Sequence, residues 1–128
     1  MSELNKSLVR RFYQEVENQG KLDLIEELFD PNFQDVYNLV LPFQVRGHEG
    51  VRQLVTFLQG LRAPGGPGLT ITIEDLIAEG DKVVARLSSG QTVDSPGGRV
   101  TSQFIEIFRV ENGKLVERWV FIDRGGHT

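Results

Sequence analysis

Hydrophobic residues recur at helical spacing over the first half of the chain. In the opening stretch they lie four residues apart, at Leu4, Leu8, Phe12 and Val16. This spacing gives one apolar face and predicts a helix from Ser2 to Gly20, where glycine is a favourable C-cap. Similar spacing predicts a shorter helix over residues 21–29, which a proline at position 31 would end. A third helix is predicted after Gly47-His48-Glu49-Gly50, beginning near Val51, and the glycine- and proline-rich stretch 64–68 would end it.

The remaining sequence is rich in β-branched and aromatic residues and predicts strands. A short strand is predicted first, and four longer ones follow the third helix. In order they are Asn32–Tyr37, Leu69–Ala78, Val83–Val93 and the two arms of a hairpin over Arg99–Asp123. Turns are predicted at 79–82 and 94–98. This order gives the fold class α+β, with three N-terminal helices on one face of a curved antiparallel sheet in a single domain over residues 1–128.

The terminal hairpin turns at Asn112-Gly113, and the length of its loop sets which residues face each other. A two-residue loop would place Glu106 opposite Trp119, whereas a three-residue loop over 111–113 would place it opposite Arg118. We favour the three-residue loop, because Glu-Asn-Gly fits a type I turn followed by a left-handed glycine. This register predicts a Glu106–Arg118 pair.

Both faces of the hairpin are substantially apolar. One face carries the predicted pair together with Phe104, Val120 and Ile122. The other face carries Ile105, Ile107, Trp119 and Phe121. A sheet with one wet face would alternate apolar and polar residues more cleanly, so each face needs a cover. We expect the helices to cover the first face and a second subunit to cover the other, in a homodimer.

The composition narrows the possible functions. The 128 residues include 18 acidic and 14 basic ones, for a formal net charge of −4, and no cysteine. The negative charge disfavours nucleic acid as a partner, because phosphate binding needs clustered Lys and Arg. The absence of cysteine excludes disulfides, thiolate metal ligands and a cysteine nucleophile. His48 and His127 are far apart and have no ligand spacing, so we expect no metal and no cofactor.

The sequence also lacks signals for membranes and for phosphate loops. No apolar run approaches the ~18 residues of a membrane span, and the N-terminus lacks the basic-then-apolar order of a signal peptide. We therefore expect a cytoplasmic protein without membrane contact. The glycines at 65–68 and 97–98 do not form a Gly-x-x-x-x-Gly-Lys pattern, so we interpret both stretches as turns.

The order of elements and several short stretches resemble the SnoaL-like branch of the nuclear-transport-factor-like superfamily. The stretches are Arg10-Arg11-Phe12-Tyr13, Gln19-Gly20-Lys21-Leu22-Asp23, Phe33-Gln34-Asp35, Gly47-His48-Glu49-Gly50-Val51 and Ile105-Glu106-Ile107-Phe108-Arg109. The resemblance implies a cone-shaped sheet wrapped by the helices around an apolar cavity, with a dimer through the outer sheet face. It does not select a function, because this fold hosts isomerases, cyclases, dehydratases, epoxide hydrolases and non-catalytic modules.

Three residues correspond to the site of ketosteroid isomerase, a distant member of this superfamily. Tyr13 matches the tyrosine that donates to the dienolate oxygen, Asp35 matches the aspartate base, and Glu106 matches the protonated aspartate of the oxyanion hole. Two features depart from that pattern. The segment before Asp35 is two residues shorter, and the acid at 106 is glutamate.

The last strand departs from the polyketide cyclases of the family. Their His-Trp-Asp stretch, with the His and Asp acting as acid and base, is Arg118-Trp119-Val120 here, and Val36 stands where the first strand often carries His. The cyclase mechanism is therefore not supported. Arg118 would also hold a facing Glu106 ionised, so that Glu106 could not donate as a neutral acid.

An alternative is that Arg118 itself is the electrophile or anion clamp, oriented by Glu106. Asp35 would then be the general base and Tyr13 a second hydrogen-bond donor. Each residue also has a plain structural interpretation. Tyr13 would be a core tyrosine, Asp35 a turn or surface aspartate, and the Glu106–Arg118 pair a cross-strand ion pair.

The candidate substrate contacts are aromatic and aliphatic side chains. Tyr37, Phe43 and Phe57 could line a cavity, although ordinary core packing is the simpler interpretation, and Phe104, Val120 and Ile122 share the predicted inner face. The apolar loop 38–46 would either close over a pocket or pack in an interface. These features favour a cofactor-free isomerase or lyase that moves a proton next to a carbonyl of a small hydrophobic molecule. A non-catalytic binding protein and a dimerisation module are the alternatives.

Overall fold

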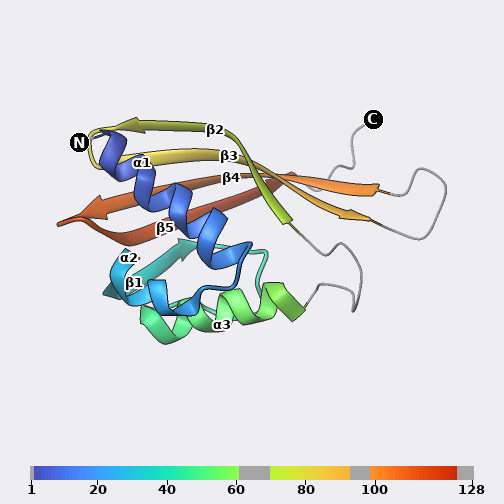
Figure 1. Cartoon of the computed structure of the whole chain (residues 1–128), viewed down its shortest axis with the longest axis horizontal. Coiled ribbons are helices and arrows are strands. Elements are labelled where there is room, and N and C mark those ends of the chain that lie inside the picture. The colour runs from blue at the N-terminus through green and yellow to red at the C-terminus, as the bar shows by residue number, and fades with distance from the viewer. Residues whose placement is uncertain (1, 61–69, 93–98, 124–128) are drawn as a thin grey trace.

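The computed structural model describes residues 2–60, 70–92 and 99–123. The predicted glycine-rich turns at 64–68 and 94–98, and His127, lie outside the described residues. Ten helical and strand segments account for most of the described chain (Figure 1). In the described ranges, no helix is both long enough and apolar enough to cross a membrane.

The first predicted helix is present but changes its winding. It runs as the α-helix α1 over Ser2–Arg11 and continues as the π-helix η1 over Phe12–Glu17. The wider turn is closed by the backbone N–H of Asn18, which donates to the carbonyl of Tyr13, five residues back, at 3.0 Å. Gly20 follows with φ of 74°, a left-handed conformation that suits glycine at a helix end.

The second predicted helix is shorter than expected. A 3₁₀ turn, η2 over Leu22–Leu24, leads into α2 over Ile25–Leu28, and strand β1 begins at once and spans Phe29–Tyr37. The expected helix to residue 29 and strand start at Asn32 were therefore wrong. Pro31 lies inside the strand, which is possible because β1 is at the edge of the sheet. The third helix, α3, spans Gly47–Gly60 and begins earlier than predicted, because residues 47–50 form its first turn.

The four later strands form the predicted antiparallel meander. They are β2 over Thr70–Glu79, β3 over Lys82–Thr92, β4 over Arg99–Glu111 and β5 over Lys114–Asp123. The order in the sheet is β1-β5-β4-β3-β2, and β1 pairs parallel with β5. The N-terminal strand thus lies against the last one, which brings residue 35 beside residue 118.

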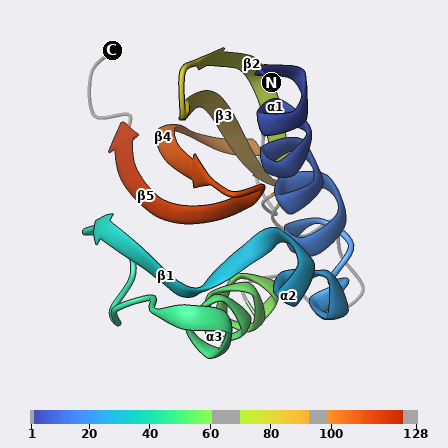
Figure 2. The same ribbon diagram turned by 90° about the vertical axis from the view of Figure 1, so that its left-hand side faces the viewer.

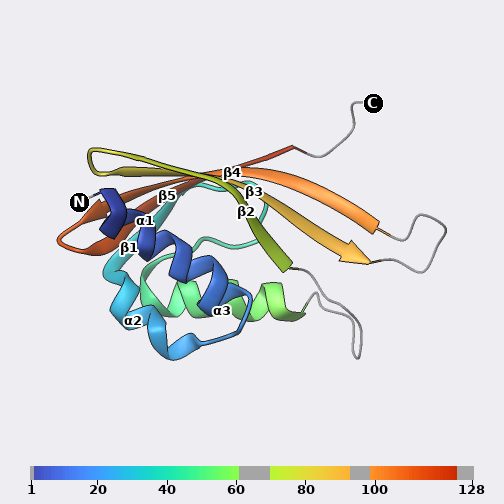
Figure 3. The same cartoon turned by 45° about the horizontal axis from the view of Figure 1, so that its top comes forward.

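The sheet is strongly curved, and the helices lie on its concave side (Figure 2). Figure 3 shows α1 crossing beneath β2 and β3 while α3 runs below β1. The space between contains an aromatic core in which Phe12, Phe29 and Phe33 contact edge to face, with ring centroids 5.0 and 4.7 Å apart. The curved sheet, the covering helices and the buried core confirm the predicted α+β class.

The hairpin register differs from the prediction. Only Asn112 and Gly113 form the loop, with φ of 52° and 73°, as a type I′ turn requires. An extra residue, Val116, then bulges from β5, so that Glu106 pairs with Val120 and Phe108 pairs with Arg118. The predicted register was wrong by two residues. Because side chains alternate with a period of two, this shift leaves every residue on the face that was predicted for it.

Candidate active site

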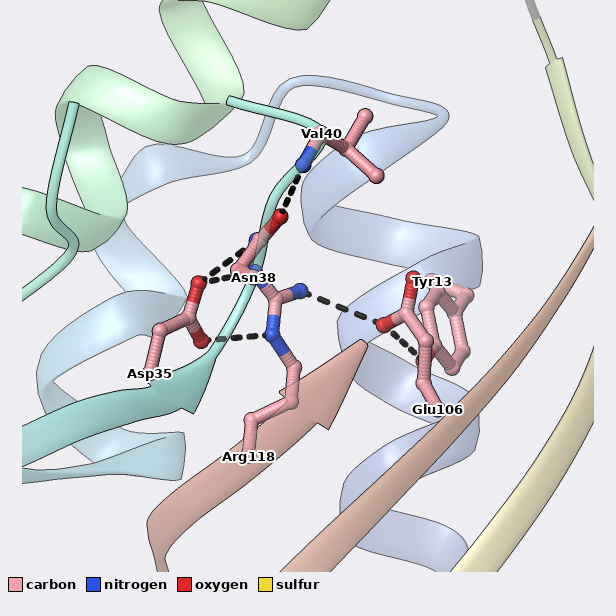
Figure 4. Close-up of polar contacts among 6 residues, drawn as sticks. All are labelled: Tyr13, Asp35, Asn38, Val40, Glu106 and Arg118. Carbon is pink, nitrogen blue, oxygen red and sulfur yellow. Dashed lines mark hydrogen bonds and ion pairs between the residues drawn. The ribbon is translucent and has the colours of Figure 1, made fainter. Parts of the chain in front are cut away.

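A buried arginine is at the centre of the candidate site. Arg118, on β5, is 2% exposed and donates from Nε and Nη2 to the two carboxylate oxygens of Asp35, each at 2.7 Å (Figure 4). Its Nη1 donates to Glu106 Oε1 at 3.2 Å. The guanidinium carbon is also 6.0 Å from the ring centroids of Phe12 and Phe108. One cation therefore serves two carboxylates inside an aromatic core.

Glu106 is held by two donors on one oxygen. The Tyr13 hydroxyl donates to Oε1 at 2.6 Å, in addition to the bond from Arg118. The other oxygen, Oε2, accepts no hydrogen bond from the described residues. Glu106 therefore has the surroundings of an ionised carboxylate with one oxygen left for a ligand. The contact between Glu106 and Arg118 is present as a diagonal pair, although the two residues are not directly opposite.

Asp35 is more completely engaged than Glu106. Its Oδ2 accepts a second hydrogen bond from Asn38 Nδ2 at 2.9 Å, so both oxygens are occupied. Its own N–H donates to the carbonyl of Val45 at 3.0 Å. Asn38 Oδ1 in turn accepts from the N–H of Val40 at 2.9 Å. These bonds connect Arg118 through Asp35 to the loop that follows β1 (Figure 4).

A small cavity of about 60 Å³ lies beside this network. Its polar lining comprises Glu17, Asn38, Ser89, Glu106 and Arg118. Its apolar lining comprises Val40, Leu41, Leu54, Leu58, Ile71, Phe104 and Val120. The volume holds about two waters, so the described space admits a small polar head group. Asp35 and Tyr13 do not line the cavity. Asp35 contacts Arg118, and Tyr13 contacts Glu106.

Glu17, Asn38 and Ser89 are polar residues of this site that the sequence did not reveal, and Glu17 is the ionisable one. It ends the π-helix η1, is 5% exposed, and lines the cavity with Glu106. A sequence signal was available, because Glu17 lies four residues after Tyr13, a spacing that places both side chains on one helix face. An acid on an otherwise apolar face is the pattern that could have identified it.

Burial dominates the electrostatics of the site. It raises the pKa of Glu17 from 4.5 to about 8, and the negative charges of Glu106 and Asp35 add to the rise while Arg118 opposes it. Burial also raises the pKa of Glu106, against the influence of Arg118 and the Tyr13 hydroxyl. The pKa of Tyr13 is raised by burial and then by Glu106. Glu17 is therefore protonated at neutral pH.

Arg118 keeps its positive charge in this environment. Burial works against it, but the carboxylates of Asp35 and Glu106 outweigh the desolvation and raise its pKa. Three carboxyl groups thus surround one permanent cation. Two of these acids, Asp35 and Glu106, hydrogen-bond to the guanidinium, so two acidic side chains share one positive charge.

The other expected ligand contacts are divided between several places. Phe104 and Val120 line the cavity. Tyr37 does not, because it stacks on Phe121 with ring centroids 5.1 Å apart and is 42% exposed. Phe43 and Phe57 contact each other edge to face at 5.6 Å and line a separate open groove along α3. Ile122 is half-buried and is not among the lining residues.

The sequence matches the family model of SnoaL-like polyketide cyclases over residues 7–127. The chain belongs to this family. No curated protein matches the sequence. The departures at Arg118, Val120 and Val36 are therefore differences within the family.

Solved structures support this assignment of fold. A candidate polyketide cyclase from Bacillus cereus is 31% identical, with a TM-score of 0.71 over 91% of this chain and 72% of that one. TsrD from Streptomyces laurentii is 24% identical, with a TM-score of 0.73 over 94% and 89%. An epoxide hydrolase from M. tuberculosis that is like LEH is 17% identical, with a TM-score of 0.69 over 94% and 84%.

Proposed function

We propose that the protein is a cofactor-free enzyme of isomerase or lyase type that moves a proton next to a carbonyl group. Family membership supports a small-molecule-binding or cyclase- and isomerase-type role. The observation that carries the proposal is the pair of carboxyl groups at one cavity. Glu106 has an oxygen free of hydrogen bonds from the described residues, and Glu17 has a pKa near 8. Two acids whose environments differ in this way suit a base and an acid.

In this proposal Glu106 is the general base. Its Oε2 takes a proton from the carbon next to the carbonyl, while Tyr13 and Arg118 hold Oε1 and fix the orientation of the carboxylate. Its raised pKa makes it a stronger base than an ordinary glutamate. Glu17, protonated at neutral pH, donates its proton to the carbonyl oxygen, and an enol forms. Return of a proton to carbon at the same or another position completes an exchange or an isomerisation.

The sequence alone favours Asp35 as the base and Arg118 with Tyr13 as oxyanion donors. The hydrogen bonds support a different division of roles. Asp35 accepts three side-chain hydrogen bonds and does not line the cavity. We therefore propose that Asp35 and Tyr13 are positioning residues, which act through Arg118 and Glu106. Arg118 keeps two N–H groups beyond the three that donate to Asp35 and Glu106, and these suit a ligand oxygen.

Proton exchange tests this proposal without knowledge of the natural substrate. A panel of small hydrophobic ketones and enones is incubated with the protein in D₂O, and deuterium at the carbon next to the carbonyl is measured by NMR. Wild type should accelerate exchange of at least one compound. In Glu106→Gln the exchange rate should be about 10²–10⁴-fold lower. Glu117→Gln is the matched control, because Glu117 lies on the neighbouring strand β5 and pairs with Arg109 at 2.6 Å, away from the cavity. Equal rates in Glu106→Gln and wild type would refute the role of Glu106.

We also propose that the protein is a homodimer through its outer sheet face. The register places Ile77, Val84, Ile107 and Trp119 in one row across β2 to β5. Beside that row, Ile105 and Phe121 are paired and are 37% and 44% exposed. Light scattering after size-exclusion chromatography should give twice the monomer mass for wild type. The variant Ile105→Arg should give the monomer mass. A wild-type monomer at high concentration would contradict this part of the proposal.

A further inference from the structure

We infer that the cavity at Glu17, Glu106 and Arg118 accepts ligand head groups that are uncharged or positively charged and excludes carboxylates. The inference rests on the proposed function in that it names the substrate class of the same cavity. It also departs from the anion-clamp role that the sequence suggests for Arg118. The reason is that the arginine is already engaged by carboxylates inside the protein.

The guanidinium of Arg118 is already engaged by carboxyl groups of the protein. Its Nε and Nη2 contact both oxygens of Asp35 at 2.7 Å in a bidentate pair, and its Nη1 contacts Glu106 at 3.2 Å. A guanidinium attracts an anion strongly only when its own charge is not neutralised. Here two acidic side chains, 2% and 10% exposed, share its one positive charge.

The position of the acidic side chains disfavours a ligand carboxylate in the cavity. A ligand carboxylate that reached Arg118 would lie next to the carboxyl group of Glu106, which lines the same cavity. Like charges in a desolvated site repel strongly. An amide or ketone oxygen adds no charge and can accept from the remaining N–H groups of Arg118 or from the carboxyl proton of Glu17. A cationic head group would be attracted by the acidic side chains.

This charge balance also constrains the reaction. When Glu106 takes a proton from carbon and Glu17 gives one to oxygen, the total charge of the site is unchanged, and the ligand stays uncharged as an enol. Formation of a free enolate would instead place a second negative charge in the same small volume. The arrangement therefore suits neutral carbonyl compounds whose proton transfers are coupled.

The test uses three isosteric ligands that differ in charge, namely benzamide, benzoate and benzamidine. Their dissociation constants are measured by ligand-observed NMR at pH 7, where the amidine is a cation. Benzamide should bind, benzamidine should bind at least as tightly, and benzoate should bind about tenfold more weakly than benzamide or worse. Benzoate binding equal to or tighter than that of benzamide overturns the inference. Absence of binding by all three also overturns it, since a site for uncharged head groups should take benzamide.

Variants locate the effect in the cavity. Glu106→Gln replaces the acid beside Arg118 by an amide, so the affinity for benzoate relative to benzamide should rise about tenfold. Glu117→Gln makes the same replacement on the outer face and should leave all three constants unchanged. Identical relative affinities for benzoate in wild type and Glu106→Gln would contradict the assignment. The deuterium-exchange assay is separate, so a protein that selects by charge without exchange would refute the proposed enzyme alone, and exchange without charge selection would refute this inference alone.

Discussion

Replacing Glu17 by glutamine should make the protein more stable, and increasingly so as the pH rises. The carboxyl group is 5% exposed, and the charged groups around it are Glu106 on β4, Arg118 on β5 and Asp35 on β1. Burial and two of these three neighbours disfavour its ionisation. Glutamine keeps the shape and the hydrogen-bonding capacity of a protonated glutamate but cannot ionise. The substitution therefore removes the cost of a buried charge and little else.

The pKa of Glu17 gives the size and sign of the effect. The unfolded chain releases this proton near 4.5, whereas the folded protein holds it to about 8. Between these values the unfolded state binds fewer protons, so wild-type stability falls as the pH rises. At about 1.36 kcal/mol per pKa unit, the full effect is about 5 kcal/mol above pH 8. Below pH 4.5 the contribution of Glu17 vanishes, and the two proteins should be equally stable.

Urea unfolding of wild type and Glu17→Gln between pH 5 and pH 9 measures this effect. The difference in unfolding free energy should grow with pH and level off above about pH 8. Glu15→Gln is the control on the same π-helix, because Glu15 is partly exposed and pairs with Arg11 at 3.4 Å. Parallel pH profiles for wild type and Glu17→Gln would refute the reasoning, since Glu17 would then ionise as readily in the folded protein as in the unfolded chain.

Three further predictions concern residues around the site and the hairpin. Arg118→Met should cost about 3–5 kcal/mol of stability at pH 7, because Asp35 and Glu106 lose their shared cation; a loss below 1 kcal/mol in urea unfolding would contradict the buried ion pair. Tyr13→Phe should raise the pKa of Glu106, whose pKa the hydroxyl lowers, and shift the pH profile of proton exchange upward; an unshifted profile argues against the bond. Gly113→Ala should cost about 1–2 kcal/mol through its φ of 73° and leave benzamide binding intact, whereas a change in binding would show that the turn influences the cavity.

The amino-acid sequence predicted the fold well because its signals are periodic. A hairpin slipped by two residues still places Glu106 and Arg118 on the inner face, so the contact survived a wrong register. Local sequence patterns failed to predict element boundaries that are set by tertiary contacts. Nothing near Phe29 in the sequence indicates that β1 will pair with β5 and end the second helix so early.

The candidate site was predictable only in part, for a similar reason. Tyr13, Asp35 and Glu106, which the resemblance groups in one site, do meet, and Arg118, which the hairpin pattern placed beside Glu106, joins them. The role of each depends on which hydrogen bonds the others leave free, and that requires three-dimensional geometry. The four-residue spacing places Glu17 on the same helix face as Tyr13, but only the structure shows that the π-helix buries both side chains.

The cost of burying Glu17 is itself an argument for function. A helix that faces an apolar core could carry leucine or glutamine here and would be more stable above neutral pH. Proteins retain such unfavourable groups mainly where activity requires them. The two interpretations of Glu17 then differ in one combined result. If Glu17→Gln raises stability at pH 8 and also abolishes deuterium exchange, the buried acid trades stability for proton transfer. If it raises stability and exchange is unaffected, Glu17 is a structural residue and the acid of the reaction lies elsewhere.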